Sequence, residues 1–252
     1  MRDAEMAGLT GRIAVVTGAA GTMGRATAEA LQADGCRLAL IDIDARALDA
    51  LCAALPESSL PVVCDVSDES AVAAACERIR RELGDPDILV NNAGILSNHK
   101  MLQTGLVEWR QVLGVNLDGA FLMARELVPA MKARHWGRII NTGSLAAKTG
   151  GLTAGTAYAA SKGALSSLTF SLARELAPHG VTANGISPAY VRTPMLTEQL
   201  TDAQRDALLR DIPVGRFCEP EEFAHVVRFL ASPLAGFITG EIIDINGGLL
   251  MD

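Results

Sequence analysis

The chain reads TGAAGTMG from Thr17 to Gly24, directly after the apolar run Ile13–Thr17 and directly before an alanine-rich segment. A strand, a turn of small residues and the start of a helix together form a site for anions, because backbone N–H groups converge there and the positive end of the helix faces the ligand. Glycines let the turn bend sharply and approach a pyrophosphate closely. The stretch therefore predicts a dinucleotide-binding turn, although glycine-rich turns also occur where nothing binds.

The next apolar run, Leu38–Ile41, ends in a carboxylate at Asp42. An acidic side chain about 20 residues beyond the glycine turn accepts hydrogen bonds from the adenosine ribose in dinucleotide-binding folds. A carboxylate there would repel a 2′-phosphate, and neither Gly21 nor Ile43 offers a cation to bind one. We therefore expect NAD rather than NADP, with the alternative that Asp42 only caps the turn that follows it.

Short β-branched runs alternate with alanine-rich helical stretches along most of the chain. Most of the runs lack a regular apolar–polar alternation, as expected of strands covered on both faces. This pattern predicts an α/β fold, a Rossmann-type, doubly wound, seven-stranded parallel sheet with helices on both faces. The expected strands are Ile13–Thr17, Arg37–Asp42, Pro61–Cys64, Asp87–Asn91, Arg138–Thr142, Val181–Ser187 and Glu241–Ile245. The expected helices are Met23–Ala33, Ala45–Leu55, Glu69–Leu83 (with Ser67 as its N-cap and Gly84 as its stop), Val107–Ala133, Tyr158–Ala177 and Glu219–Leu230.

The composition excludes several classes of protein. The 252 residues are 49% hydrophobic and 20% charged, which indicates a globular chain with a large core and not a disordered one. A formal net charge of −7 argues against nucleic-acid binding. No apolar run is long enough to cross a membrane, and residues 1–12 lack the apolar core of a signal peptide. Five cysteines without a C-x-x-C pair and four scattered histidines indicate reduced thiols, a cytoplasmic protein and no metal site.

Polar or small residues end two further predicted strands. Asp65 and Val66 follow the third strand, and Asn92, Ala93 and Gly94 follow the fourth. In a doubly wound sheet both segments lie at the carboxyl edge, where such folds bind their ligands. We expect both to contact the cofactor, whereas each taken alone could be a turn. No Pro/Ser-rich linker or long repeat interrupts the chain, so we expect a single domain over residues 1–252.

Tyr158 and Lys162 are four residues apart in a predicted helix, so they share one face about one turn apart. Lys162 is the only charged residue between Leu152 and Ala173, and a lone charge in so apolar a helix requires a partner or a function. A tyrosine that acts as a base near neutral pH needs a pKa shift of about three units, or roughly 4 kcal/mol. One ammonium at about 4.5 Å supplies nearly that much at an effective dielectric near 20. The pair therefore predicts a tyrosine general base.

Four motifs together resemble the short-chain dehydrogenase/reductase family: the T-G-x-x-x-x-x-G turn, the N-N-A-G segment, Ser144, and Tyr158-x-x-x-Lys162. The resemblance spans nearly the whole chain, from Gly11 to Gly248. It implies that Tyr158 is the general base or acid and that Ser144 and Tyr158 bind the oxygen of the substrate. It also implies that Lys162 binds the nicotinamide ribose of a bound dinucleotide.

Two more places match the family. Asn116, inside the predicted helix Val107–Ala133, is implied in a proton relay that links Lys162 to solvent, with a structural asparagine as the alternative. The segment Pro188–Thr193 resembles the one that holds the nicotinamide carboxamide. The expected catalytic residues are Asn116, Ser144, Tyr158 and Lys162. The residues expected to bind the cofactor are Gly18, Gly21, Thr22, Met23, Gly24, Asp42, Ile43, Asp65, Val66, Asn92, Ala93, Gly94, Tyr158, Lys162, Pro188, Val191 and Thr193.

The chain departs from the family pattern at three places. Ser144 and Tyr158 are separated by one residue more than is usual, and the extra residue falls in the glycine-rich stretch Gly150–Gly155. Ala189 stands where the family usually has glycine, which alanine can replace only if its φ is negative. The middle glycine of the turn is Gly21, one position earlier than usual. We expect an altered pocket shape and retained activity.

These observations predict an NAD-dependent oxidoreductase that exchanges hydride between NAD and a secondary alcohol or ketone. The alternative is a 3-oxoacyl-[acyl-carrier-protein] reductase, an enzyme that usually takes NADPH and meets an acidic carrier. Asp42 and the negative net charge count against it. A third possibility is a dinucleotide-sensing protein without turnover, which the intact Ser144, Tyr158 and Lys162 set disfavours.

The substrate pocket is expected between Ile95–Leu102, Leu145–Ala157 and Ala189–Leu209. The segment near 190–215 could close over the substrate as a small lid or pack ordinarily. Within it, Thr193–Ile212 carries the large apolar residues Met195, Leu196, Leu200, Leu208 and Leu209. The resemblance further implies a homotetramer, and we expect a small-molecule substrate with neither nucleic acid nor membrane as a partner.

Overall fold

The structure is a computed structural model, and it describes residues 8–55, 59–193 and 201–251. Within these residues, seven parallel strands form one sheet in the order β3-β2-β1-β4-β5-β6-β7. The order reverses between β1 and β4, which opens a crevice at the carboxyl ends of the strands. The doubly wound α/β fold predicted from the sequence is thus confirmed. The strands are β1 (Ile13–Thr17), β2 (Arg37–Asp42), β3 (Ser59–Val63), β4 (Ile88–Asn91), β5 (Gly137–Thr142), β6 (Val181–Pro188) and β7 (Ile242–Ile245).

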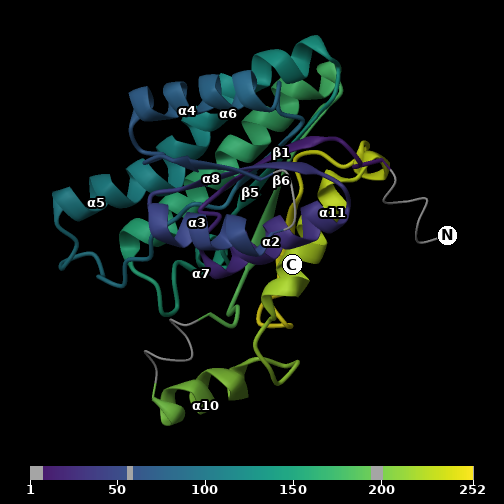
Figure 1. Ribbon diagram of the computed structural model, residues 1–252. Helices are drawn as coiled ribbons and strands as arrows, with labels where there is room; N and C mark the ends of the chain where they lie inside the picture. Colours follow the sequence, from purple (N-terminus) through teal and green to yellow (C-terminus); the bar gives the residue numbers. More distant parts are fainter. Residues whose placement is uncertain (1–7, 56–58, 194–200, 252) are drawn as a thin grey trace.

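Helices cover both faces of the sheet (Figure 1). One layer consists of α2 (Thr22–Ala33), α3 (Ala45–Ala54) and α11 (Pro220–Ala231), and the other of α4 (Glu69–Glu82), α5 (Leu106–Leu113), α6 (Gly119–Ala133) and α8 (Thr156–Leu176). Each layer has its own apolar core, and successive residues of a strand alternate between the two. Val15 belongs to the core under α4, α6 and α8, whereas Val16 belongs to the core under α2, α3 and α11.

Some boundaries differ from those expected. The predicted helix Val107–Ala133 is continuous but consists of α5, a π-helical turn η1 (Gly114–Asp118) and α6. The third strand begins at Ser59 instead of Pro61, because Ser59 pairs with Leu38 of β2. Ser67 is not the N-cap of α4: the carboxylate of Asp68 accepts hydrogen bonds from two backbone N–H groups of the first turn, which a single hydroxyl does less well.

Within the described ranges, four short helical elements were not expected from the sequence. They are α7 (Ala146–Thr149), η2 (Ala177–His179), α10 (Asp202–Asp211) and η3 (Pro233–Ala235). The helix α10 lies in the predicted lid segment and projects from the rest of the structure in Figure 1. Its sequence, DAQRDALLRD, is mostly polar and has no strong helical stripe of apolar residues to signal it. Three of the lid residues named above, Met195, Leu196 and Leu200, lie outside the described residues.

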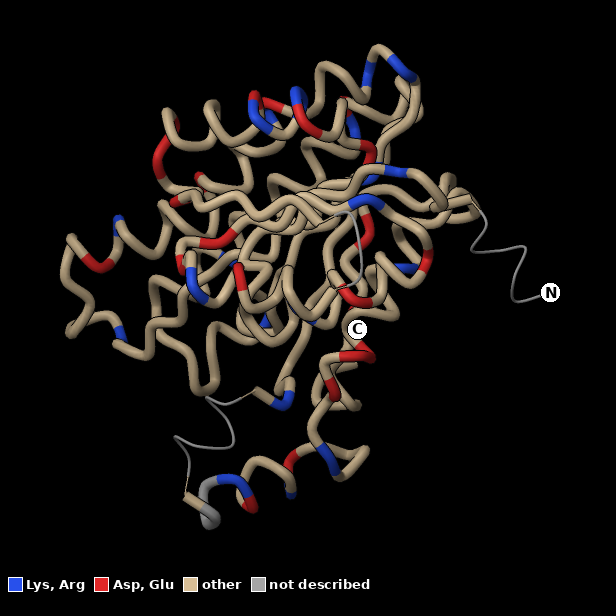
Figure 2. The backbone as a smooth tube through the Cα atoms, viewed as in Figure 1, with Lys and Arg blue, Asp and Glu red and all other residues tan. Residues whose placement is uncertain are grey.

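Charged residues lie mainly on the outer helices and loops, and the strands at the centre contain few of them (Figure 2). All five cysteines are free thiols, three of them buried. No helix in the described part of the chain is both long enough and apolar enough to cross a membrane. Polar residues end the buried strands at the carboxyl edge of the sheet, and this edge is where we expect a functional site.

Candidate active site

A cavity of about 380 Å³ lies at the carboxyl edge of the sheet, beside the ends of β4, β5 and β6. Each of the three pocket-wall segments expected from the sequence contributes to it, through residues such as Leu96, Leu152 and Tyr190. The helix α10 contributes Leu208. Thr142 and Gly143 also line the cavity and were not expected, although their position directly before Ser144 could have indicated them.

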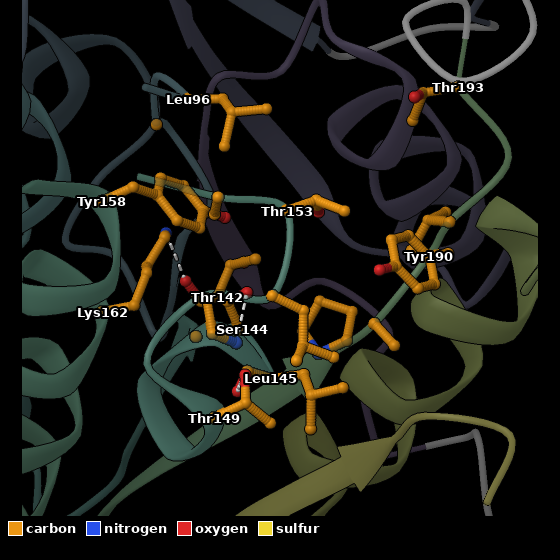
Figure 3. A pocket seen from close by; sticks show the side chains of 18 of the residues that line it. Leu96, Thr142, Ser144, Leu145, Thr149, Thr153, Tyr158, Lys162, Tyr190 and Thr193 are labelled. Atoms are coloured by element: carbon orange, nitrogen blue, oxygen red, sulfur yellow. Dashed lines mark hydrogen bonds between the residues drawn. The ribbon is translucent and has the colours of Figure 1, made fainter. Parts of the chain in front are cut away.

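Tyr158 and Lys162 reach the cavity from the first two turns of α8, and Ser144 reaches it from the segment after β5 (Figure 3). The sequence prediction that these three side chains share one pocket agrees with this geometry. The hydroxyl of Ser144 accepts a hydrogen bond from the Ala146 N–H at 3.1 Å and also lies within hydrogen-bond reach of the Tyr158 phenol. The phenol and the serine hydroxyl can therefore bind the same oxygen atom of a ligand.

Lys162 is buried, and its ammonium donates a hydrogen bond to the backbone carbonyl of Thr142 at 2.7 Å. Burial lowers the pKa of Lys162 to about 8, because a buried ammonium loses its hydration. Burial also raises the pKa of the Tyr158 phenol, since the same loss disfavours the phenolate, and the hydrogen bond with Ser144 acts in the opposite direction.

The lysine and the tyrosine face one cavity, but the hydrogen bond of the lysine goes to the backbone of Thr142. The lysine nitrogen is 5.7 Å from the centre of the Tyr158 ring and is bound to Thr142, so the predicted effect of the ammonium on the acidity of the phenol stays a prediction. The group that opposes the effect of burial on the tyrosine is Ser144. The chain by itself therefore holds Tyr158 in its protonated form at neutral pH. Helical spacing brings two side chains to one face but does not say which acceptor a flexible lysine finds.

Asn116 lies in the π-helical turn η1 and is buried. Its side-chain oxygen accepts a hydrogen bond from the Ile95 N–H at 2.8 Å, and its amide donates to the Ile95 carbonyl and to the Ser161 hydroxyl, each at 3.0 Å. The hydroxyl of Ser161 in turn donates to the Tyr158 carbonyl at 2.7 Å. The side chain of Asn116 thus joins the loop after β4 to the helix that carries Tyr158, and a role in a proton relay stays a prediction.

The glycine turn fits a pyrophosphate. Gly21 is the N-cap of α2 and offers no side-chain acceptor, so no side chain caps the first turn of this helix. A side chain at Gly24 would collide with the backbone of Gly18 and Ala19, so the close approach of helix and turn requires glycine at this position. Met23, in the first turn of α2, also lines the cavity. The predicted cofactor residues Gly18, Gly21, Thr22, Met23 and Gly24 are therefore held beside it.

Asp42 ends β2 at the same edge, and its carboxylate is tied to the glycine turn. One oxygen accepts a hydrogen bond from the Ala20 N–H at 2.9 Å, and the other accepts from the Asp44 N–H at 3.1 Å. The alternative considered above, that Asp42 caps the following turn, describes the second bond. Both bonds use backbone donors, so the charge of the carboxylate is not neutralised by a cation in either of them. Ile43 beside it is largely exposed.

The loop after β4 is bound to the end of β1. The side-chain amide of Asn92 donates to the carbonyls of Thr17 and Gly18 at 3.1 Å, and the Thr17 hydroxyl accepts from the Asn92 and Ala93 N–H groups at 3.0 Å. Thr17 was not among the expected site residues, although a polar residue at the end of an otherwise apolar strand could have indicated it. Asn92 and Gly94 line the cavity itself.

The remaining residues predicted to bind the cofactor lie along the same edge of the sheet. Some can face a ligand with their side chains and others only with their backbone groups. Val66 has its side chain in the apolar core, so only its backbone can face a ligand. The carboxylate of Asp65 accepts from the N–H and hydroxyl of Ser67, and it orders the turn after β3. The cavity is lined by Pro188, Val191 and Thr193, and also by Ala189. Ala189 does not have a positive φ, so the alanine is accommodated without strain.

The described residues contain no group of three or more His, Cys, Asp or Glu side chains arranged to hold a metal ion. What the site offers is an uncapped helix N-terminus, a carboxylate beside it, and a buried ammonium, a phenol and a hydroxyl around one cavity. Groups of this kind bind a dinucleotide and exchange a proton with an oxygen atom of a ligand.

Comparisons with known proteins agree with this chemistry. The sequence profile of a family described as enoyl-(acyl carrier protein) reductase matches residues 18–250. The 3-oxoacyl-[acyl-carrier-protein] reductase FabG of Vibrio harveyi is 39% identical over 243 residues, covering 96% of this chain and 99% of the relative. The enzyme of the same name from Escherichia coli strain K12 is 38% identical over 242 residues, covering 96% of this chain and 98% of the relative.

A crystal structure from Brucella melitensis has the same fold. It is described as a short-chain dehydrogenase/reductase of the glucose/ribitol dehydrogenase type, and it superposes with a TM-score of 0.88 at 36% sequence identity. The match covers 96% of this chain and 98% of the other.

Proposed function

The chain belongs to the short-chain dehydrogenase/reductase family and is an oxidoreductase, and from this premise we propose that it exchanges hydride between NAD and a secondary alcohol or ketone. The observation that carries the proposal is the convergence of Ser144, Tyr158 and Lys162 on one cavity at the carboxyl edge of the sheet. A phenol, a hydroxyl and an ammonium are the groups needed to bind an oxygen atom and to move a proton to or from it.

Members of this family bind a nicotinamide dinucleotide, and we propose NAD as the form used here. The backbone N–H groups at the start of α2 would hold the pyrophosphate, and Asp42 would accept hydrogen bonds from the adenosine ribose. The unneutralised carboxylate of Asp42 would repel a 2′-phosphate on that ribose. Lys162 would donate to the second ribose. The bound dinucleotide supplies the hydride in ketone reduction and accepts it in alcohol oxidation.

Residues of the chain itself transfer the proton to or from the oxygen of the substrate. In reduction, the protonated Tyr158 phenol donates its proton to the oxygen of the ketone, and in oxidation the phenolate removes the proton of the alcohol. The hydroxyl of Ser144 donates a hydrogen bond to the same oxygen and fixes its position. The ammonium of Lys162, held in place by Thr142, stabilises the negative charge that appears on the phenol when the proton leaves.

The cavity favours a substrate with an uncharged body. Among the described residues that line it, Lys162 is the only one with a charged side chain, and leucines such as Leu96, Leu145 and Leu152 form much of the wall. A carboxylate or phosphate on the body of the substrate would lose its hydration there without gaining a cationic partner. We therefore propose an uncharged, mostly apolar secondary alcohol or ketone.

A second candidate is the reduction of 3-oxoacyl-[acyl-carrier-protein] substrates. The names of the similar Vibrio harveyi and Escherichia coli proteins support it, and an acyl chain would also suit an apolar pocket. Asp42 and the net charge of −7 disfavour it, since they oppose an NADPH phosphate and an acidic carrier. The two proposals are separated by the cofactor: a strong preference for NADPH over NADH would favour the second.

The proposed chemistry is tested by replacing Tyr158 with Phe and measuring NADH oxidation with a panel of ketones and NAD reduction with the matching alcohols. We expect turnover to fall at least a hundredfold, because the proton donor is lost, while the Kd of NADH changes less than about threefold. Tyr190→Phe is the matched control, since Tyr190 is the other tyrosine of the chain and lines the same cavity. Unchanged turnover in Tyr158→Phe would overturn the mechanism.

We further propose that the chain forms a single domain that assembles into a homotetramer. Phe121 on α6, Phe170 on α8 and Phe237 near the C-terminus are exposed aromatic side chains, which a further chain could cover. Light scattering on the purified protein measures the mass directly. A monomer at micromolar concentration would contradict this proposal and leave the chemistry above untouched.

A further inference from the structure

The segment between α7 and α8, residues 150–155, is a turn with an exposed tip that lines the cavity. Gly150 and Gly151 both have left-handed backbone conformations, with φ of +72° and +82°. The side chain of Leu152 at the tip is 65% exposed, whereas Ala154 is buried, so burial of apolar surface fixes the end of the segment but not its tip. Yet Leu152, Thr153 and Ala154 line the cavity, and their position determines its shape.

Lys100 constrains the tip of this segment. Its ammonium donates hydrogen bonds to the carbonyl of Gly151 at 2.8 Å and to the carbonyl of Ala154 at 2.6 Å, so one side chain binds both ends of the exposed turn. These are charge-assisted bonds, which are stronger than those between neutral groups. Because one ammonium binds two carbonyls of the same turn, it restricts the conformation of that turn.

Residues 96–100 form a second wall of the pocket, and this wall contacts the first wall, residues 150–155. The Gly155 N–H donates to the Ser97 carbonyl at 2.6 Å, and the Thr156 N–H donates to the His99 carbonyl at 3.0 Å. A Cβ atom at Gly155 would lie 2.8 Å from the Asn98 carbonyl carbon, so the two backbones can approach this closely only with glycine there. The two walls are therefore joined along their length.

The second wall is itself anchored to α5. The carboxylate of Glu108 accepts a hydrogen bond from the Ser97 hydroxyl, and its other oxygen lies 2.9 Å from Nδ1 of His99. The Thr104 hydroxyl donates to the His99 carbonyl at 3.0 Å. The backbone that precedes Lys100 is thus fixed to a helix, and the lysine transmits that fixed position to the turn at residues 150–155.

We propose that Lys100 is a positioning residue for the substrate: through the carbonyls of Gly151 and Ala154 it sets the distance between the two walls of the cavity. Leu96 and Asn98 lie on one wall, and Leu152 and Thr153 on the other. The lysine acts on the binding of the substrate and contacts neither the reacting oxygen nor the proton donor. The inference rests on the proposed function, since it takes this cavity to be the substrate pocket.

The test compares Lys100→Met, which keeps the length of the side chain without the charge, with Lys100→Arg, which keeps donors for two carbonyls. We expect KM for a ketone accepted by the parent enzyme to rise about tenfold in Lys100→Met, with kcat and the Kd of NADH changed less than about threefold. Lys100→Arg should recover most of the loss. Lys132→Met, at a loose surface pair with Glu175, is the matched control and should behave as the parent.

Hydrogen–deuterium exchange gives a second measurement that does not depend on turnover. In Lys100→Met, the backbone amides of residues 150–156 should exchange faster, and in Lys132→Met they should not. If Lys100→Met does not fold, Lys100→Gln serves in its place. Unchanged KM, or a fall in kcat without a change in KM, overturns the proposal, as does unchanged exchange. If the parent turns over no alcohol or ketone, the proposed function fails, and the exchange experiment still tests whether Lys100 holds the turn.

Discussion

Lys162 donates a hydrogen bond from its ammonium to the backbone carbonyl of Thr142 at 2.7 Å, and its nitrogen lies 5.7 Å from the centre of the Tyr158 ring. The end of β5 therefore fixes the ammonium, and the phenol is its neighbour rather than its hydrogen-bond partner. Burial lowers the pKa of Lys162 to about 8 and raises the pKa of Tyr158. As the pH rises, the lysine is the first of the two groups to lose its proton.

This order predicts the pH dependence of ketone reduction. Tyr158 keeps its proton throughout the neutral range, so the proton donor is present and kcat/KM for reduction should be nearly constant below about pH 8. Above that pH Lys162 loses the charge that stabilises the developing phenolate, and kcat/KM should fall. The measurement is NADH oxidation with one ketone between pH 6 and 10. Any residual activity of Lys162→Arg should lack this fall, because a guanidinium keeps its charge; a parent rate that rises through pH 8 would contradict the assignment.

Burial of the Lys162 ammonium also lowers the free energy of unfolding. Between pH 8 and the ordinary lysine value of 10.5, the unfolded chain binds a proton that the folded chain has released. The free energy of unfolding should therefore rise with pH in this window, and the full destabilisation is present below pH 8. Lys162→Met should be more stable than the parent at pH 7 by about 2 kcal/mol, after allowance for the lost bond to Thr142.

Urea unfolding of both proteins at pH 7 and pH 10 measures this effect. The advantage of Lys162→Met should shrink at pH 10, and other groups that titrate in this range cancel in the comparison because both proteins contain them. A methionine variant that is less stable than the parent at pH 7 would mean that the bond to Thr142 outweighs the desolvation of the ammonium.

Asp42→Asn should weaken the preference for NADH over NADPH. The change removes the charge that faces a 2′-phosphate and keeps an oxygen that can accept the Ala20 N–H, so the turn should stay in place. We expect the ratio of kcat/KM values for NADH and NADPH to fall about tenfold or more. Asp44→Asn is the control, because Asp44 caps α3 and asparagine is an equally good N-cap. A parent that already prefers NADPH would contradict the proposed cofactor.

The sheet was largely predictable because its strands carry a strong local signal. The runs Ile13–Thr17 and Arg37–Asp42 are found with the predicted bounds, since apolar β-branched residues flanked by turn residues leave few alternatives. The mostly polar helix Asp202–Asp211 has no such signal, because a helix that packs little against a core shows no apolar stripe. The π-helical turn at Gly114–Asp118 has the composition of the α-helix around it and shows only in the hydrogen-bond pattern.

The positions of site residues could be predicted where sequence spacing determines them. The hydrogen-bond acceptors of long side chains could not be predicted. Tyr158 and Lys162 share a cavity because four residues separate them on one helix. That Lys162 binds Thr142, and that Lys100 binds carbonyls about 50 residues away in the sequence, depends on tertiary contacts between loops. The resemblance to a family gave the expected catalytic set but not Lys100, because the four motifs that carry the resemblance do not include that position.

Asn116→Ala should reduce both stability and turnover. The side chain of Asn116 is buried and satisfies the N–H and the carbonyl of Ile95 as well as the hydroxyl of Ser161, so its removal leaves polar groups without partners. The free energy of unfolding should fall by about 2 to 3 kcal/mol, measured in urea. Asn98→Ala, at an exposed position, should change it by less than about 0.5 kcal/mol. Because Ser161 in turn bonds to the Tyr158 carbonyl, kcat should fall more than KM rises. A variant that loses stability but keeps the parent's kcat would restrict Asn116 to a structural role and remove it from the proposed proton relay.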